Sequence, residues 1–193
     1  PERFRDAYRH IIDLFRKDDV TNITWCFHVY PPSEIGEPGV LDQPWNAIKN
    51  YYPGDNYIDW IGVSVYGSFD RGASWGSFTH ILDLAYPQLA ALSSKKPIAV
   101  FEFGVLEDPT IGNKSSWIQD ALQSIVNGQY PRIKAISYWN EKWNDCIIVC
   151  IPGLNGVINL KLNSSSASLD TYRKLISSPF FLSNAQYQYG KNN

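Results

Sequence analysis

The chain has 193 residues, a formal net charge of −2, and 44% hydrophobic against 19% charged residues. This length and composition allow one domain with a sizeable core and exclude a disordered protein. The near-neutral charge offers no basic surface for nucleic acid or anionic membranes. No apolar run approaches the roughly 20 residues of a membrane span, so neither nucleic acid nor a membrane is an expected partner.

Helices and strands are predicted to alternate along the chain. Apolar residues at helical spacing from Phe4 to Phe15 predict an opening helix, and the β-branched and aromatic residues of 22–29 predict a strand. Further strands are predicted at 57–66, 97–103 and 133–140, and further helices at 78–92, 115–126 and 166–176. We therefore expect one domain over residues 1–182, followed by a polar tail at 183–193.

The number of elements limits the fold class. A complete (β/α)₈ barrel of the TIM type needs eight strands and typically about 250 residues. Four strands alternating with helices indicate either half of such a barrel or a small open α/β sheet. One face of residues 58–66 carries Val63 and Val65, whereas the other is small or polar and ends in Tyr66. Doubly wound sheets are apolar on both faces, so the pattern favours a half-barrel of parallel strands with outer helices.

Strict alternation along the strands also predicts which side chains face the helices. We expect Val63, Val65 and Phe101 on the helix-covered face, and Glu102 together with Val100 on the other. Barrel enzymes carry their chemistry at the carboxyl ends of the strands. Tyr66, Glu102 and Trp139 stand at those ends, so they are the first candidates for a site.

The three cysteines, Cys26, Cys146 and Cys150, leave at least one thiol outside any disulfide within the chain. Cys146 and Cys150 are spaced to close a small disulfide loop, or they are two ordinary thiols beside an apolar patch. Cys26 and His28 lie near each other, but no further ligand stands at metal-binding spacing. We therefore expect no metal and no cofactor.

Glu102 ends an apolar strand, where a carboxylate is costly to bury without a role or a partner. The alternative is a capping or salt-bridged glutamate.

Seven tryptophans and twelve tyrosines indicate either a core rich in rings or a surface on which sugars stack.

Several segments resemble family 26 of the glycoside hydrolases, which contains β-mannanases and related β-glucanases and xylanases. Residues 51–62 resemble the segment that precedes and forms that family's sixth strand, and residues 97–104 and 133–140 resemble its seventh and eighth strands. Residues 1–25 resemble the fourth helix and fifth strand, and residues 172–181 the closing helix. The resemblance covers nearly the whole chain in order and implies strands five to eight of the barrel.

The resemblance implies a retaining endo-β-glycanase, similar to β-1,4-mannanases, that cleaves plant-type polysaccharides by double displacement. It implies that Glu102 is the nucleophile, that Tyr66 orients it by a hydrogen bond, and that Trp139 forms the floor of the −1 subsite. A β-glycan polysaccharide or oligosaccharide is then the expected partner.

Further substrate-binding candidates at the mouth of the barrel are His28, Glu141 and Trp143. Three of the site candidates have a plainer alternative: His28 as a structural, hydrogen-bonded histidine, Glu141 as a solvated loop charge, and Tyr66 as an aromatic residue at the rim.

One departure from the family pattern concerns the second carboxylate. In the family, the acid/base glutamate stands in a His-Glu pair after the fourth strand, and no such pair occurs in this chain. The loop carboxylates available are Glu34, Glu37, Glu107, Glu141 and Asp145. We therefore expect the acid/base residue to be missing from this chain. The alternative function is a non-catalytic half-barrel that binds glycan or only associates with a partner chain.

A half-barrel has two open strand edges, which invite pairing with another chain. The expected partners are a second copy, through the strands of Trp25 and Tyr138, or the missing N-terminal half. Sequons for glycosylation at Asn22, Asn113 and Asn163 favour a secreted protein.

Overall fold

The computed structural model describes residues 1–31, 43–68, 75–144 and 157–182. Its four α-helices are α1 (Glu2–Lys17), α2 (Phe78–Leu92), α3 (Lys114–Val126) and α4 (Ser166–Ile176). The strands are β1 (Cys26–Val29), β2 (Trp60–Tyr66), β3 (Ile98–Gly104), β4 (Ile133–Tyr138), β5 (Lys142–Asn144) and β6 (Val157–Asn159). Short 3₁₀ turns are formed by Pro44–Asn46, Ile48–Asn50 and Leu162–Ser164.

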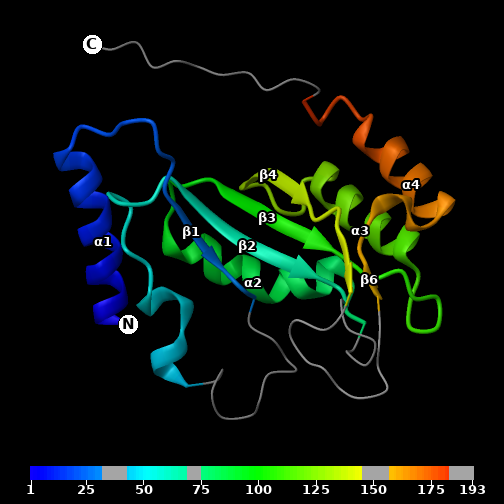
Figure 1. The fold of residues 1–193 in the computed structure, drawn as a ribbon, viewed down its shortest axis with the longest axis horizontal. Helices are drawn as coiled ribbons and strands as arrows, with labels where there is room; N and C mark the ends of the chain where they lie inside the picture. The colour runs from blue at the N-terminus through cyan, green and yellow to red at the C-terminus, as the bar shows by residue number, and fades with distance from the viewer. Residues whose placement is uncertain (32–42, 69–74, 145–156, 183–193) are drawn as a thin grey trace.

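Strands β1 to β4 form one parallel sheet in the order β1-β2-β3-β4. Figure 1 shows this sheet between α1 at one end and α4 at the other, with α2 behind it. The predicted half-barrel of four parallel strands with outer helices is confirmed. The antiparallel pair β5–β6 was not predicted, because strands of three residues are too short to show a periodic pattern.

Side-chain caps explain where three of the helices begin. Ser77 precedes α2 and its hydroxyl accepts a hydrogen bond from the His80 N–H at 3.1 Å. Asn113 caps α3 by accepting from Ser116 N–H at 2.8 Å, and Ser165 precedes α4 in the same way. Each cap satisfies a backbone donor that the first turn leaves free.

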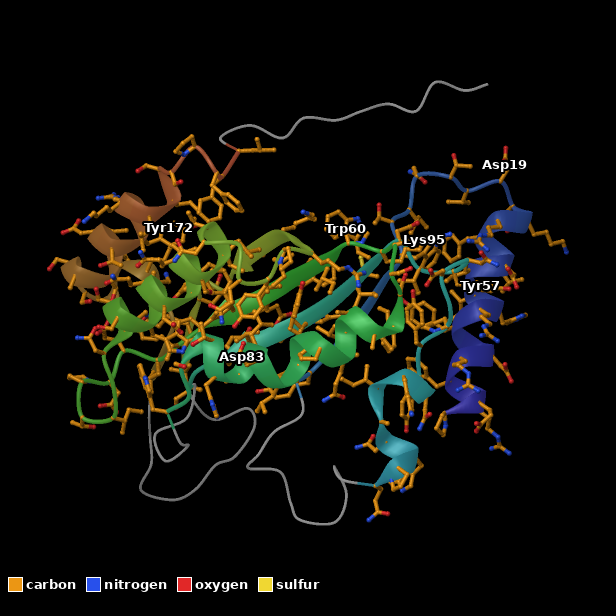
Figure 2. All side chains as sticks on the ribbon, turned by 180° about the vertical axis from the view of Figure 1, so that it is seen from behind. Asp19, Tyr57, Trp60, Asp83, Lys95 and Tyr172 are labelled. Carbon is orange, nitrogen blue, oxygen red and sulfur yellow. The ribbon has the colours of Figure 1, made fainter. Side chains whose placement is uncertain are left out.

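The core lies between the sheet and the helices α2 and α3. Val63 and Val65 of β2 are fully buried there against α2, as predicted. Figure 2 shows α2 lying across this face of the sheet, with Asp83 on the helix and Trp60 at the beginning of β2. Burying a side chain of this size contributes about 1.5–3 kcal/mol to stability. The sheet is therefore most stable with this apolar face against the helices.

Strand β3 departs from regular alternation, and two of the predictions made from alternation are wrong. Val63 pairs with Val100 and the next residue, Ser64, pairs with Glu102, so Phe101 is an extra residue in β3. The same offset appears against β4, where Val100 pairs with Ile136 and Phe103 with Tyr138.

This β-bulge changes the face of the residues beyond it. Val100 and Phe103 both lie in the helix-covered core, whereas Phe101 lies on the open face, with its ring over Gly62. Glu102 therefore does not share a face with Val100, and Phe101 does not share a face with Val63. The bulge turns the carboxylate away from the core.

The two outer strands of the sheet, β1 and β4, each pair on one side only within the described residues. Beside β4, a groove of about 900 Å³ runs between the strand and α4, with Ile136, Tyr138, Tyr172 and Phe181 among its lining residues. On α1, the side chains of Phe4, Ile11 and Leu14 are exposed. Both ends of the half-barrel thus carry uncovered apolar surface.

Among the described residues, no helix has the length and apolarity to cross a lipid bilayer. The predicted tail at 183–193, the loop carboxylates Glu34, Glu37 and Asp145, and the pair Cys146 and Cys150 lie outside the described residues.

Candidate active site

The candidate site lies at the carboxyl ends of β2 and β3. Because the two strands are parallel neighbours and Ser64 pairs with Glu102, the end of β2 brings its polar side chains to the carboxylate. The Tyr66 hydroxyl donates a hydrogen bond to Glu102 Oε2 at 2.8 Å, and the Ser64 hydroxyl lies 3.4 Å from the same oxygen. Two hydroxyls from one strand thus face one oxygen of the carboxylate.

The electrostatics of this pair favour Tyr66 as a permanent donor. Burial, together with the hydrogen bond to Glu102 and its negative charge, raises the pKa of the Tyr66 phenol above its usual value. The phenol therefore stays protonated and donates. A donor held against the carboxylate fixes its orientation, and an ionised carboxylate is the form that can act as a nucleophile.

His28 reaches the cluster from β1. Its Nε2 lies 2.8 Å from the Ser64 hydroxyl oxygen, and its ring meets the Phe101 ring edge-on, with 5.4 Å between centroids. The imidazole itself is exposed. The cluster thus joins β1, β2 and β3, with Ser64 between the histidine and the glutamate.

Trp139 follows the end of β4, and its backbone N–H donates to the Phe103 carbonyl at 2.9 Å. The side chain is 40% exposed, which leaves part of the indole available for stacking. Gly104, two residues after Glu102, lies beside both the Tyr66 ring and the Trp139 backbone. Trp139 therefore stands at the same edge of the sheet as Glu102 and Tyr66.

The other loop candidates are not joined to this cluster by any described contact. Glu141 is exposed, and its carboxylate accepts a long hydrogen bond from the next residue, Lys142, at 3.4 Å. Trp143 lies on β5, but its side chain is outside the described part of the structure.

Glu107 belongs to a separate polar cluster. Its carboxylate accepts hydrogen bonds from Ser164, Ser165 and Ser168 at 2.8, 3.0 and 3.0 Å. The nearby Lys114 is fully buried, and its ammonium donates to Ser164 and to the backbone carbonyls of Asn159 and Lys161. These contacts connect the beginning of α3 to β6 and α4.

Two members of the cluster were not identified from the sequence. Ser64 shares the face of Tyr66 by simple alternation, and that parity was the available signal. No sequence signal pointed to Phe101, because strict alternation assigned it to the opposite face.

Cys26 has a free, half-buried thiol whose pKa is raised by burial. In the ranges described, no three His, Cys, Asp or Glu side chains are grouped to hold a metal ion.

Comparison with known proteins places the chain among carbohydrate-active enzymes. The family model for glycosyl hydrolase family 26 matches residues 1–144. Endoglucanase H of Acetivibrio thermocellus is 31% identical over 180 residues, which cover 91% of this chain and 17% of that protein.

Solved structures share the fold at lower identity. The β-mannanase BoMan26A of Bacteroides ovatus matches with 22% identity and a TM-score of 0.56, over 94% of this chain and 44% of that one. An endo-β-1,4-mannanase of Cellulomonas fimi matches with 18% identity and a TM-score of 0.60, over 92% and 36%. The catalytic domain of an endo-β-1,4-mannanase from Bacillus sp. JAMB-750 has the same identity and TM-score, over 93% and 44%. The chain spans less than half the length of each of these relatives.

Proposed function

The chain belongs to glycosyl hydrolase family 26, and from this premise we propose that it is the C-terminal half of the catalytic barrel of a retaining endo-β-glycanase. The half-domain comprises residues 1–182, and 183–193 form a polar tail. The observation that carries the proposal is the Glu102 carboxylate at the end of β3, with the Tyr66 hydroxyl 2.8 Å from it.

In this proposal Glu102 is the nucleophile of a double displacement. Its free oxygen attacks the anomeric carbon, the leaving sugar departs with a proton from a general acid, and a covalent glycosyl-enzyme forms. Water activated by the same acid/base group then releases the sugar from Glu102. Before the attack, Tyr66 orients the carboxylate through its hydrogen bond, because its phenol remains protonated and donates.

The second carboxylate must stand about 5–5.5 Å from the nucleophile in a retaining enzyme. Glu107 is committed to its serines, and Glu141 is exposed and bonded within its own segment. Neither of these two described loop carboxylates is free for the role, and the chain has no His-Glu pair. We therefore propose that the acid/base residue is supplied by the other half of the barrel.

The substrate class we propose is a β-1,4-linked plant-type polysaccharide, with mannan first. Three of the structural relatives are β-mannanases by name and the sequence relative is an endoglucanase, which supports a choice between these backbones. Trp139 would stack on the sugar in the −1 subsite, and His28, Glu141 and Trp143 lie on elements that lead to the mouth of the barrel. The sequons at Asn22, Asn113 and Asn163, all exposed, support secretion.

The test is covalent labelling of the 193-residue chain. A 2-deoxy-2-fluoro glycoside with a dinitrophenolate leaving group needs no general acid, so it reports on the nucleophile alone. Mass spectrometry of peptides should place the sugar on Glu102, Glu102→Gln should abolish the label, and the control Glu141→Gln should retain it. A label on Glu107 or Glu141 would contradict the assignment.

The alternative function is a non-catalytic half-barrel that binds glycan or only associates with a partner chain. The partly exposed indole of Trp139 favours glycan binding, because stacking requires no carboxylate. Such a protein would bind oligosaccharide in a titration, lose that binding on Trp139→Ala, and acquire no covalent label from the fluorinated glycoside.

A further inference from the structure

We propose that His28 is a positioning residue for the nucleophile: its Nε2–H donates to Ser64, which directs the Ser64 hydroxyl proton toward Glu102. This inference rests on the proposed role of Glu102. It extends the support of the carboxylate from β2 to β1.

The direction of the hydrogen bonds follows from counting hydrogens. A serine hydroxyl has one proton to donate, and an ionised carboxylate only accepts. Ser64 Oγ lies 2.8 Å from His28 Nε2 and 3.4 Å from Glu102 Oε2, so the hydroxyl proton can go to one of them. When Nε2 carries a hydrogen, Ser64 accepts from His28 and donates to Glu102.

The opposite arrangement is less favourable for the carboxylate. If Nε2 lacks a hydrogen, Ser64 donates to the imidazole and turns an oxygen lone pair toward Glu102. Two oxygens with facing lone pairs repel each other, and Tyr66 is then the remaining hydroxyl donor of this pair. At 3.4 Å the contact between Ser64 and Glu102 is long, so it depends on how the hydroxyl is oriented.

Phe101 holds the imidazole in place for this role. The His28 ring is exposed, but it contacts the Phe101 ring in an edge-type arrangement, with an interplanar angle of 72°. Phe101 in turn lies on Gly62, where a Cβ atom would come within 2.0 Å of the ring. The bulge that aims Glu102 thus also supplies the ring that orients His28.

The first experiment determines which nitrogen of His28 carries the proton. Nitrogen NMR of the imidazole in the 193-residue chain distinguishes the two tautomers, with His28→Gln as the control that removes and so assigns the signal. We expect a protonated Nε2. An unprotonated Nε2 would overturn the inference, whatever the activity of the chain.

The second experiment measures the rate of covalent labelling of Glu102 by the activated fluoroglycoside. His28→Phe keeps a ring and removes the donor, whereas His28→Gln keeps an N–H donor. We expect His28→Phe and Ser64→Ala each to slow labelling about 3- to 10-fold, and His28→Gln to restore most of the rate. The double variant should be no slower than Ser64→Ala, because both changes remove the same bond.

Two failures are distinguishable. A wild-type chain that acquires no label contradicts the proposed function and the inference with it. If the wild-type chain and His28→Phe are labelled on Glu102 at the same rate, the inference alone is contradicted. It is also contradicted if the effects of His28→Phe and Ser64→Ala on the labelling rate multiply in the double variant. Thermal melting of each variant separates these outcomes from loss of the fold.

Discussion

Glu102 depends on Tyr66 more than on any other described donor. The phenol lies 2.8 Å from Oε2, and its raised pKa keeps it protonated. A hydrogen bond to a charged group contributes about 1.5–3 kcal/mol, and about 1.4 kcal/mol corresponds to a tenfold change in rate. We therefore predict that Tyr66→Phe slows labelling of Glu102 by about 10- to 100-fold.

The control for this prediction is Tyr57→Phe, which removes a hydroxyl that donates to Asp13 on α1, remote from the site. Its labelling rate should equal that of the wild type. An unchanged rate in Tyr66→Phe would remove the tyrosine from the mechanism.

Gly62 is required by the ring that covers it. A Cβ at this position would lie 2.0 Å from the Phe101 ring, whereas one at Gly104 would have its nearest neighbour at 3.5 Å, an ordinary contact. Overpacking typically costs about 1–3 kcal/mol, so Gly62→Ala should lower the free energy of unfolding in urea by about that amount. Gly104→Ala is the matched control, and equal losses in the two variants would contradict this account.

The residues of the site were predictable to different degrees. Glu102, Tyr66 and Trp139 stand at strand ends, where alternation of apolar and polar residues points to them. The contact between Ser64 and His28 joins two strands 36 residues apart in sequence, and local patterns do not encode which neighbours a sheet will bring together. The position of Phe101 depends on the bulge, which leaves no mark on the composition of residues 97–104.

At the scale of elements, Lys114 links α3 to β6 and to the 3₁₀ turn before α4, and it makes the stability depend on pH. Burial lowers the pKa of its ammonium from the usual 10.5 to about 8, although the charge of Glu107 opposes this shift. Between pH 8 and 10.5 the unfolded chain therefore binds more protons than the folded one. Linkage then requires stability to rise with pH in that window, by at most about 1.4 kcal/mol per pH unit.

We predict that the free energy of unfolding in urea increases from pH 8 to pH 9.5, and that Lys114→Met loses this increase. The variant should also be less stable at both pH values, because three acceptors lose their donor. The raised pKa of the Cys26 thiol acts in the opposite direction within this range, and the raised pKa values of the buried tyrosines do so near pH 10, so the difference between the wild type and Lys114→Met gives the contribution of the lysine. If the free energy of unfolding of Lys114→Met rose by the same amount over this pH range, the increase would come from another group.

The helices and long strands were predictable because each has a strong pattern over many residues. The helix α2 spans Phe78–Leu92, the predicted range, with Ser77 as its cap. The pair β5–β6 has three residues per strand, and its existence depends on contacts between distant segments. Next to the pair, the Leu160 N–H donates to the Glu141 carbonyl at 2.9 Å, which continues the contact between the two segments.

At the scale of the molecule, the uncovered surface predicts association. Apolar side chains are exposed on α1, β4 has an unpaired edge in the described sheet, and a groove of about 900 Å³ lies beside it. Unpaired edges and apolar patches favour contact with another chain. We predict that the 193-residue chain associates with itself or is poorly soluble in light scattering, and that adding the N-terminal half of a barrel suppresses this. A monodisperse, stable monomer would contradict the prediction.

Because the proposed site lacks a general acid, we expect the chain to react with activated glycosides but not with polysaccharide. A general acid typically contributes about 10²–10⁴-fold, and an unactivated sugar leaves only when it is protonated. We expect negligible hydrolysis of mannan by the 193-residue chain, measured as reducing ends, alongside covalent reaction with the activated glycoside. Full activity on polysaccharide would mean that a carboxylate of this chain acts as the acid, and Glu141→Gln would be the first variant to examine.

The bulge in β3 lets two consecutive side chains, Phe101 and Glu102, reach the open face of the sheet. Val100 and Phe103 are anchored in the core with two residues between them, where a regular strand would place one or three. Removing Phe101 would leave a regular strand with Glu102 as the one open-face residue between the anchors, and the ring over Gly62 and beside His28 would be lost. When homologues are aligned, a one-residue gap that spares the glutamate should therefore coincide with loss of the ring that covers Gly62. The spacing between the two anchors therefore decides whether the glutamate has a neighbour on the open face.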